Sequence, residues 1–120
     1  MAGYKIDRLC SDVKLELSDI FRSLKDPRIT KHMITIVRVE LTNDLSYAKV
    51  YVDAVEGIDA AKEAVKGLVS AAGYIRRELG SRVKMRKVPE LKFIADDSIA
   101  HSAHIAKMLD DMKSQEEEIN

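Results

Sequence analysis

Apolar residues near the start of the chain recur at intervals of three and four positions, the spacing of one face of an α-helix. They are Ile6, Leu9, Cys10, Val13, Leu17, Ile20, Phe21 and Leu24. Polar residues such as Asp7 and Lys14 fill most of the remaining positions. Pro27 disfavours helical geometry at the residue before it, so we expect this helix to end near Leu24 or Lys25.

Between residues 33 and 54 the period changes to two, which indicates β-strands. The predicted apolar face of the first strand consists of Met33, Val37, Val39 and Leu41. Its opposite, mixed face consists of Ile34, Ile36, Arg38 and Glu40. Residues 42–46 predict a turn, because Asn43 and Asp44 tolerate positive φ. A second alternating strand follows at residues 47–54, so the two strands are predicted to form an antiparallel hairpin.

The following segment predicts two helices separated by a kink. Gly57 closes the strand region, and Asp59 is the expected N-cap of a helix whose apolar stripe runs to Ala72. Gly73 then interrupts the helical pattern, which costs about 1 kcal/mol relative to alanine and favours a kink. The second, shorter helix carries Ile75 and is expected to end at Gly80.

Pro89 cannot donate a hydrogen bond within a sheet, so a third strand is predicted after it, at residues 91–95. Ser98 is the expected N-cap of a last helix. The predicted order is therefore helix, strand, strand, helix, kink, helix, strand and helix. Such an order favours an α+β fold in which helices cover one face of a small mixed three-stranded sheet.

The 120 residues, 46% of them hydrophobic, suit a single domain. No apolar run approaches the roughly 18 residues of a membrane span, and the N-terminus lacks a signal-peptide core, so we expect a cytoplasmic protein. Cys10 is the only cysteine, which excludes an internal disulfide, and it is expected in the core.

Motifs for catalysis and metal binding are missing from the sequence. There is no phosphate-binding loop, no nucleophile elbow and no convincing carboxylate pair, so neither enzymatic activity nor a cofactor is predicted. His101 and His104 are spaced like two metal ligands and lie near Asp97, but no third strong ligand accompanies them. We therefore predict no metal site.

The net charge is zero, but the charges are divided unevenly along the chain. Residues 96–120 contain seven acidic and two basic residues, whereas residues 1–95 contain 18 basic and 13 acidic ones. Residues 76–92 are the most basic segment, which is typical of contact with an anionic partner. We expect its cations to bind RNA phosphates, releasing counterions, although a solvated charged face is the alternative. These candidates are Arg76, Arg77, Arg82, Lys84, Arg86, Lys87 and Lys92.

Two other features fit an RNA partner. Small residues at the kink, Ala71 and Gly73, let an RNA backbone approach the N-terminus of the next helix; alternatively, two packed helices simply need a tight corner there. Tyr47 and Tyr51 flank Lys49 on the outer strand face and are candidates for stacking on unpaired bases. Ordinary cross-strand packing is the alternative, and the pattern favours it.

Four short segments in the same order and spacing resemble the bacterial ribosome-binding factor A family, over roughly residues 5–110. They lie at residues 25–29, 44–52 and 71–76, and at residues 89–93 with Asp97 and Ser98. The element order also resembles the type II K-homology (KH) fold. The resemblance implies that an Ala-x-Gly kink replaces the Gly-x-x-Gly loop of RNA-binding KH domains. In agreement, none of the five glycines is followed by another three positions later.

The resemblance implies a non-enzymatic assembly factor that binds the free, immature 30S ribosomal subunit and its 16S rRNA and assists late maturation and rRNA processing. Residues 1–113 would form one KH-like RNA-binding domain, and residues 114–120 an acidic, disordered tail. Away from the ribosome the chain is expected to be a monomer. The alternative from a different class is a protein–protein adaptor that uses the sheet face and the acidic tail.

Overall fold

The computed structural model describes residues 2–97. Within that range the order of elements is the predicted one, with one short helix added. The predicted helix from Ser98, His101, His104 and the tail at 114–120 lie outside the described residues. The elements are α1 (Ala2–Arg22), α2 (Pro27–Thr30), β1 (Ile34–Leu41), β2 (Tyr47–Ala54), α3 (Ile58–Ser70), α4 (Ala72–Arg82) and β3 (Glu90–Ala95).

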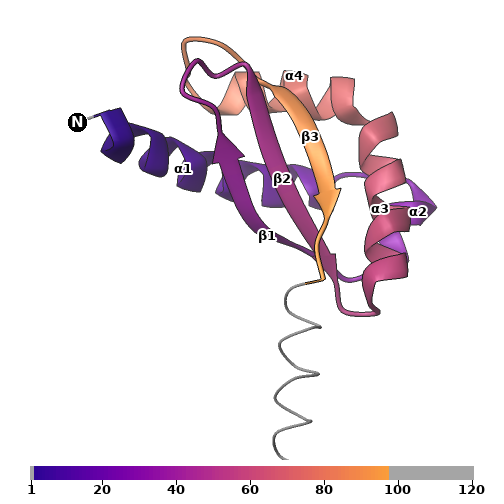
Figure 1. Ribbon diagram of the computed structural model, residues 1–120. Helices are drawn as coiled ribbons and strands as arrows, with labels where there is room; N and C mark the ends of the chain where they lie inside the picture. The colour runs from indigo at the N-terminus through magenta and orange to yellow at the C-terminus, as the bar shows by residue number, and fades with distance from the viewer. Residues whose placement is uncertain (1, 98–120) are drawn as a thin grey trace, which may run out of the picture.

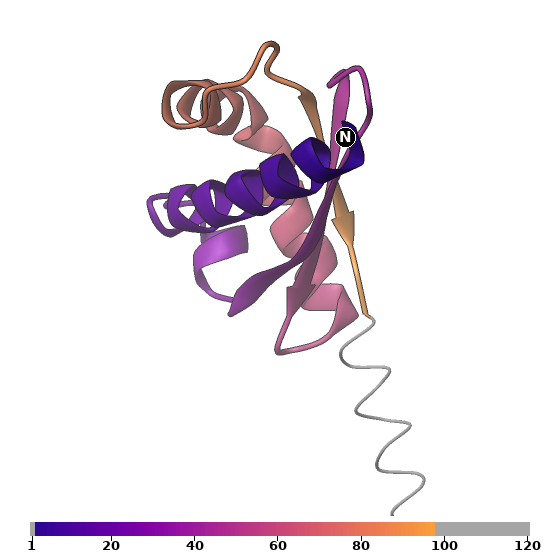
Figure 2. The same ribbon diagram turned by 90° about the vertical axis from the view of Figure 1, so that its left-hand side faces the viewer.

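The sheet has the order β1-β2-β3, in which β1 pairs with β2 antiparallel and β3 pairs with β2 in parallel. Figure 1 shows the three strands in front of the helices. In the side view of Figure 2, the helices gather on one side of the sheet, and no element among residues 2–97 covers its other face, called the open face below. The predicted α+β class, with helices on one face of a mixed sheet, is confirmed.

The core lies between the sheet and the helices that cover it. One cluster of buried side chains joins α1, α4 and the central strand β2. It includes the fully buried Leu17, Leu79 and Val50. Such residues stabilise the fold because their apolar surface leaves water. Cys10 is only half-buried, so the prediction that it belongs to the core is wrong. It lies in the N-terminal half of α1, before the first fully buried residue of the helix, Val13.

The first helix ends at Arg22, two residues before the predicted end at Leu24, because its chain tightens before Pro27. The amide of Ser23 bonds the carbonyl of Ile20 at 3.0 Å, which is a tighter, three-residue pattern typical of a helix end. The one-turn helix α2 then starts at Pro27, and the Asp26 side chain accepts from the Arg28 amide as its N-cap. Periodicity missed α2 because four residues are too few to show one.

A β-bulge in β1 changes which side chains face the core. The pairing with β2 shifts between Ile36 and Arg38, so Val37 is an extra residue in the strand. Even-numbered residues therefore face the core before the bulge and odd-numbered ones after it, so Ile36 is buried on the same side as Val39. The prediction that Met33 shares the buried face, opposite Ile36, is wrong: Met33 is 71% exposed.

Three predictions about turns and helix ends are also corrected. Gly57, with φ of 115°, is the N-cap of α3, and Asp59 lies within the first turn instead of capping it. In the 42–46 turn the positive φ falls on Leu45, at 59°, and not on Asn43 or Asp44. Helix α4 continues past Gly80 to Arg82.

Candidate nucleic-acid interface

A groove runs between edge strand β3 and the junction of α3 with α4. Its volume is about 900 Å³. Ala72, Gly73 and Arg76 line it from the helical side. Lys49 and Lys92, exposed on the open face of the sheet, line it from the other side, together with Tyr47 and the acidic Glu90. The groove thus wraps the edge of β3 and collects residues from three separate parts of the chain.

The kink residues divide between a packing role and an open surface. Ala71 separates the two helices and, with Ala72, packs half-buried against the core. Gly73 is exposed, and a Cβ atom built on it would meet nothing within 4 Å. Nothing inside the described fold therefore requires glycine at position 73. The burial of Ala71 fits the interpretation that two packed helices need a tight corner. The exposure of Gly73 fits the interpretation that an RNA backbone approaches there.

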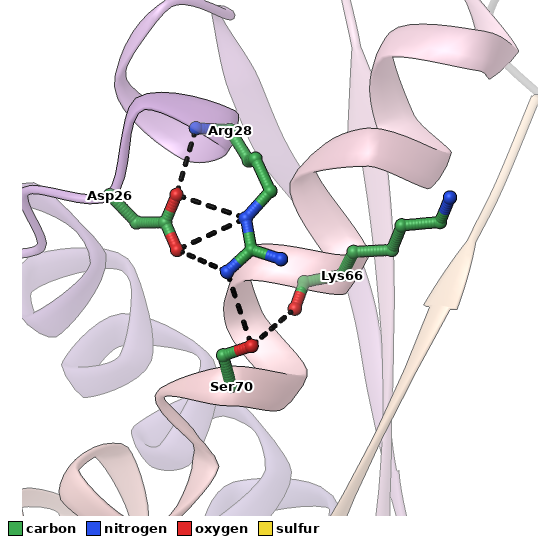
Figure 3. A network of polar contacts seen from close by, with 4 residues as sticks. All are labelled: Asp26, Arg28, Lys66 and Ser70. Atoms are coloured by element: carbon green, nitrogen blue, oxygen red, sulfur yellow. Dashed lines mark hydrogen bonds and ion pairs between the residues drawn. The ribbon is translucent and has the colours of Figure 1, made fainter.

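A polar network, shown in Figure 3, fixes the end of α3 that leads into the kink. The Asp26 carboxylate accepts two bonds from the Arg28 guanidinium through Nε, at 3.1 and 3.2 Å, and one through an Nη atom at 2.6 Å. The same Nη atom donates to the Ser70 hydroxyl at 3.1 Å, and that hydroxyl donates to the Lys66 carbonyl. The bonds from Arg28 lower the pKa of Asp26.

Close packing supports the same junction. A Cβ atom on Gly67 would lie 2.8 Å from Cγ1 of the buried Ile29, so α3 can approach α2 only because residue 67 has no side chain. The short helix α2 thus braces α3 just before the kink. Sequence reasoning missed this function of Asp26 and Arg28, although an Asp-Pro pair is a recognisable helix-start signal.

Part of the predicted basic segment forms one band from the kink to the hairpin turn. Arg76 donates to the Val88 carbonyl at 2.8 Å, and Lys87 Nζ lies 3.3 Å from Ser46 Oγ. These bonds fix the 83–89 loop between α4 and the hairpin. Five exposed cations follow this path, and within residues 2–97 none of them has a carboxylate within 4 Å: Arg76, Arg77, Lys84, Arg86 and Lys87.

Arg82 lies apart from this band. Its guanidinium contacts Asp19 at 2.6 Å and Glu16 at 3.5 Å on α1, and Glu78 at 3.9 Å on its own helix. The hydrogen bond with Asp19 raises the pKa of Arg82, so the group stays charged with three carboxylates around it. Its positive charge is already balanced inside the fold, and it joins α4 to α1.

The two tyrosines differ in their surroundings, although both belong to β2. The Arg38 guanidinium lies 3.8 Å from the centre of the Tyr51 ring, and the Tyr51 hydroxyl contacts Glu40 at 3.2 Å. Tyr51 is therefore occupied by cross-strand packing. Tyr47 is 43% exposed and lines the groove, with Lys92 Nζ at 5.3 Å from its ring centre.

The groove also includes Lys49, which lies between the two tyrosines but was not among the predicted site residues. The clean alternation of β2 was the signal that places it on the same face as Tyr47. No group of three or more metal-ligating side chains occurs among residues 2–97, and no helix in that range is long and apolar enough to cross a membrane.

The fold and groove define a small α+β domain of the type II KH-like class, with a helix–kink–helix unit beside the edge of a mixed three-stranded sheet. Within that class the chain belongs to the ribosome-binding factor A family, whose sequence model matches residues 5–109. A ribosome-binding factor A from Clostridium novyi is 42% identical over 121 residues, covering 100% of this chain and 99% of the relative.

Solved structures agree with this assignment. The crystal structure of ribosome-binding factor A from Thermus thermophilus matches with a TM-score of 0.66 and 30% identity, covering 75% of this chain and 93% of that one. A homology model of the Thermus thermophilus factor, fitted into a cryo-EM map of its complex with the 30S subunit, matches with a TM-score of 0.58 and 30% identity. That match covers 71% of this chain and 88% of the fitted chain.

Proposed function

We propose that this chain is a non-enzymatic assembly factor of the cytoplasm that binds the immature 30S subunit through its 16S rRNA and assists late rRNA maturation. It acts as a monomer away from the ribosome, with residues 1–113 as the RNA-binding domain and 114–120 as an acidic tail. One observation carries the proposal: an open glycine, Gly73, and three cations, Lys49, Arg76 and Lys92, line a single groove. The fitted 30S complex of the Thermus thermophilus factor supports the choice of partner.

Phosphate chemistry explains how the band would work. RNA presents a regular row of negative charges, and each Lys or Arg that neutralises one of them releases condensed counterions. Arg76 and Arg77 lie on the first turns of α4, beside the exposed Gly73, so a sugar–phosphate backbone can approach both the cations and the helix. Lys87, held near Ser46, extends the same path to the hairpin turn.

The decisive experiment compares two charge-matched double variants. Arg76→Gln with Arg77→Gln removes two cations from the band, and glutamine retains an amide that can donate to Val88. Arg8→Gln with Arg22→Gln removes two exposed cations from α1 that do not line the groove. Binding to purified immature small subunits is measured by sedimentation over a range of salt concentrations, after circular dichroism has confirmed that both variants are folded.

Loss of two phosphate contacts is expected to flatten the slope of log affinity against log salt by about 1.4–1.8 units in the α4 variant. The α1 variant is expected to keep a steeper slope, close to that of the parent. Equal behaviour of the two variants would show that the band does not hold the RNA. Binding that is insensitive to salt would favour the protein–protein adaptor instead.

A further inference from the structure

We propose that the open sheet face beside the groove binds one unpaired nucleotide, with its base stacked on Tyr47 and its flanking phosphates between Lys49 and Lys92. This inference rests on the proposed function, because it assumes that RNA enters the groove. It goes beyond that function by committing to a single-stranded segment and by assigning the residues that hold it. Duplex RNA is excluded, because its bases are stacked on one another and cannot reach an aromatic side chain.

The three residues lie next to one another on two paired strands. Tyr47 and Lys49 are two positions apart on β2, so their side chains leave the same face of the sheet. Lys92 of β3 stands directly opposite Lys49 in the parallel register. Its ammonium nitrogen lies 5.3 Å from the centre of the Tyr47 ring. Glu90, which also lines the groove, stands opposite Tyr47 and lies 4.0 Å from the Lys92 ammonium. A base on the Tyr47 ring would therefore take the place of the Lys92 ammonium over the ring and leave Lys49 and Lys92 beside it.

Lys49 and Lys92 face each other across β2 and β3, although each also has an acidic neighbour: Glu40 stands opposite Lys49 on β1, and Glu90 lies near Lys92. Like charges directly opposite each other on neighbouring strands are destabilising. Within residues 2–97, Lys92 has a carboxylate only at 4.0 Å, that of Glu90, and Lys49 has none within that distance. An anion placed between the two ammonium groups would relieve their repulsion, and a phosphate of an RNA strand supplies one.

Tyr51 shows what an occupied tyrosine looks like on the same strand. The Arg38 guanidinium covers its ring at 3.8 Å, and Glu40 bonds its hydroxyl. The β1 side of the open face is therefore closed by contacts within the chain. Tyr47, by contrast, is 43% exposed and borders the groove. The Lys92 ammonium also lies over the Tyr47 ring, but at 5.3 Å from its centre, against 3.8 Å for Arg38 over Tyr51. Over residues 2–97, the β3 side of the sheet thus offers the more accessible of the two rings together with a pair of facing cations.

Fluorescence tests the stacking directly, because the chain contains no tryptophan. Tyr47→Trp and Tyr51→Trp each introduce a single reporter, and each variant is titrated with a 12-nucleotide oligoadenylate and with a 12-base-pair RNA duplex. Stacking on an adenine is expected to quench the emission of the Tyr47→Trp reporter with the single strand but not with the duplex. The Tyr51→Trp reporter is expected to respond to neither.

Affinity provides a second, independent measurement. Tyr47→Leu is expected to weaken oligoadenylate binding at least about fivefold, whereas Tyr47→Phe keeps the ring and is expected to bind like the parent. Lys49→Gln with Lys92→Gln is expected to flatten the salt slope for the single strand by about 1.4 units.

The inference would be overturned by no quenching of the Tyr47→Trp reporter by the single strand, or by unchanged oligoadenylate binding of a folded Tyr47→Leu variant. If either result is found while Arg76→Gln with Arg77→Gln weakens binding to immature small subunits, the proposed function stands. Only the nucleotide site at Tyr47, Lys49 and Lys92 is then wrong. If the Tyr47→Leu variant lost affinity for the single strand and for the duplex by the same factor, stacking would likewise be refuted. Only a general electrostatic contact near Tyr47 would then remain.

Discussion

Phe21 near the end of α1 and Phe93 in the middle of β3 form an aromatic pair across the core, with ring centroids 6.2 Å apart and planes inclined at 55°. Both side chains are buried. Tilted pairs of this kind contribute beyond the apolar area they bury. The contact joins the first helix to the last described strand, so it ties both ends of the described fold to the same core.

Truncation of this pair should be costly. Phe93→Ala is expected to lower the free energy of unfolding by about 3–5 kcal/mol, because it removes a buried ring and leaves a cavity against Phe21. Urea denaturation followed by circular dichroism measures the change. Phe93→Leu, which fills much of the same volume, should lose considerably less. A midpoint unchanged by Phe93→Ala would contradict the placement of this residue in the core.

Two glycines near the kink should respond oppositely to the same substitution. Gly67→Ala is expected to destabilise the fold by about 1–3 kcal/mol, because the new methyl group collides with Ile29. Gly73→Ala meets open space and is expected to preserve or raise stability by up to about 1 kcal/mol. It should nevertheless weaken binding to immature small subunits. Thermal melts and sedimentation of both variants test the pair, and full binding by Gly73→Ala would remove this glycine from the RNA path.

The hairpin turn should lose stability in acid. Bonds from the Ser46 amide and hydroxyl and the Thr42 hydroxyl lower the pKa of Asp44 to about 2 from its usual 3.8. A carboxylate whose pKa is depressed by folding stabilises the folded state above its unfolded pKa, and this contribution disappears as the pH falls through the folded value. The stability difference between the parent and Asp44→Ala is therefore expected to be constant from pH 7 to 5 and to shrink between about pH 4 and 2.

Asn43→Ala is the matched control for this titration, since it alters the same turn without removing a carboxylate. Its difference from the parent should not change over the acid range. A pH-independent difference for Asp44→Ala as well would show that the turn owes nothing to the charge of Asp44.

The stability of the α2–α3 contact before the kink should depend on the planar guanidinium of Arg28, which binds Asp26 and Ser70 at the same time. Arg28→Lys keeps the charge but cannot bind Asp26 through two nitrogens and reach Ser70 at the same time. A lower melting temperature is expected, with faster hydrogen exchange at the amides of residues 70–75. Arg22→Lys, on the exposed surface of α1, serves as the control. Unchanged exchange at the kink in Arg28→Lys would mean that packing against Ile29 alone holds α3 in place.

Strong periodicity made most of the fold predictable, and local irregularity explains what was missed. The apolar stripe of α1 and the alternation of β2 belong to elements long enough for several repeats. The bulge at Val37 adds one residue without any break in the apolar pattern, so the sequence alone assigns Ile36 to the wrong face. The alternation of side chains along a strand predicts which sheet face each one occupies only as long as no bulge shifts the pairing with the neighbouring strand.

The candidate site was predictable where it depends on neighbours in sequence, and not where it depends on contacts across the fold. Gly73 and Arg76 belong to one helix turn, so their proximity follows from the helical repeat. Arg82 looked equivalent to the other cations, but Asp19, 63 positions away, binds it. Tyr47 and Tyr51 likewise look alike in the alternating pattern, and only the register between β1 and β2 brings Arg38 over Tyr51.

The parallel pairing of β3 with β2 has a consequence for the order of folding. The antiparallel β1–β2 hairpin closes through a short turn, whereas β3 can join β2 only after the chain has returned through α3 and α4. Contacts distant in sequence form slowly, so we expect the groove to be completed last. Tyr47, Gly73 and Lys92 meet only in the finished sheet, and an incompletely folded chain therefore has no binding surface to offer. RNA that occupies the groove binds only the native state and shifts the folding equilibrium toward it by mass action.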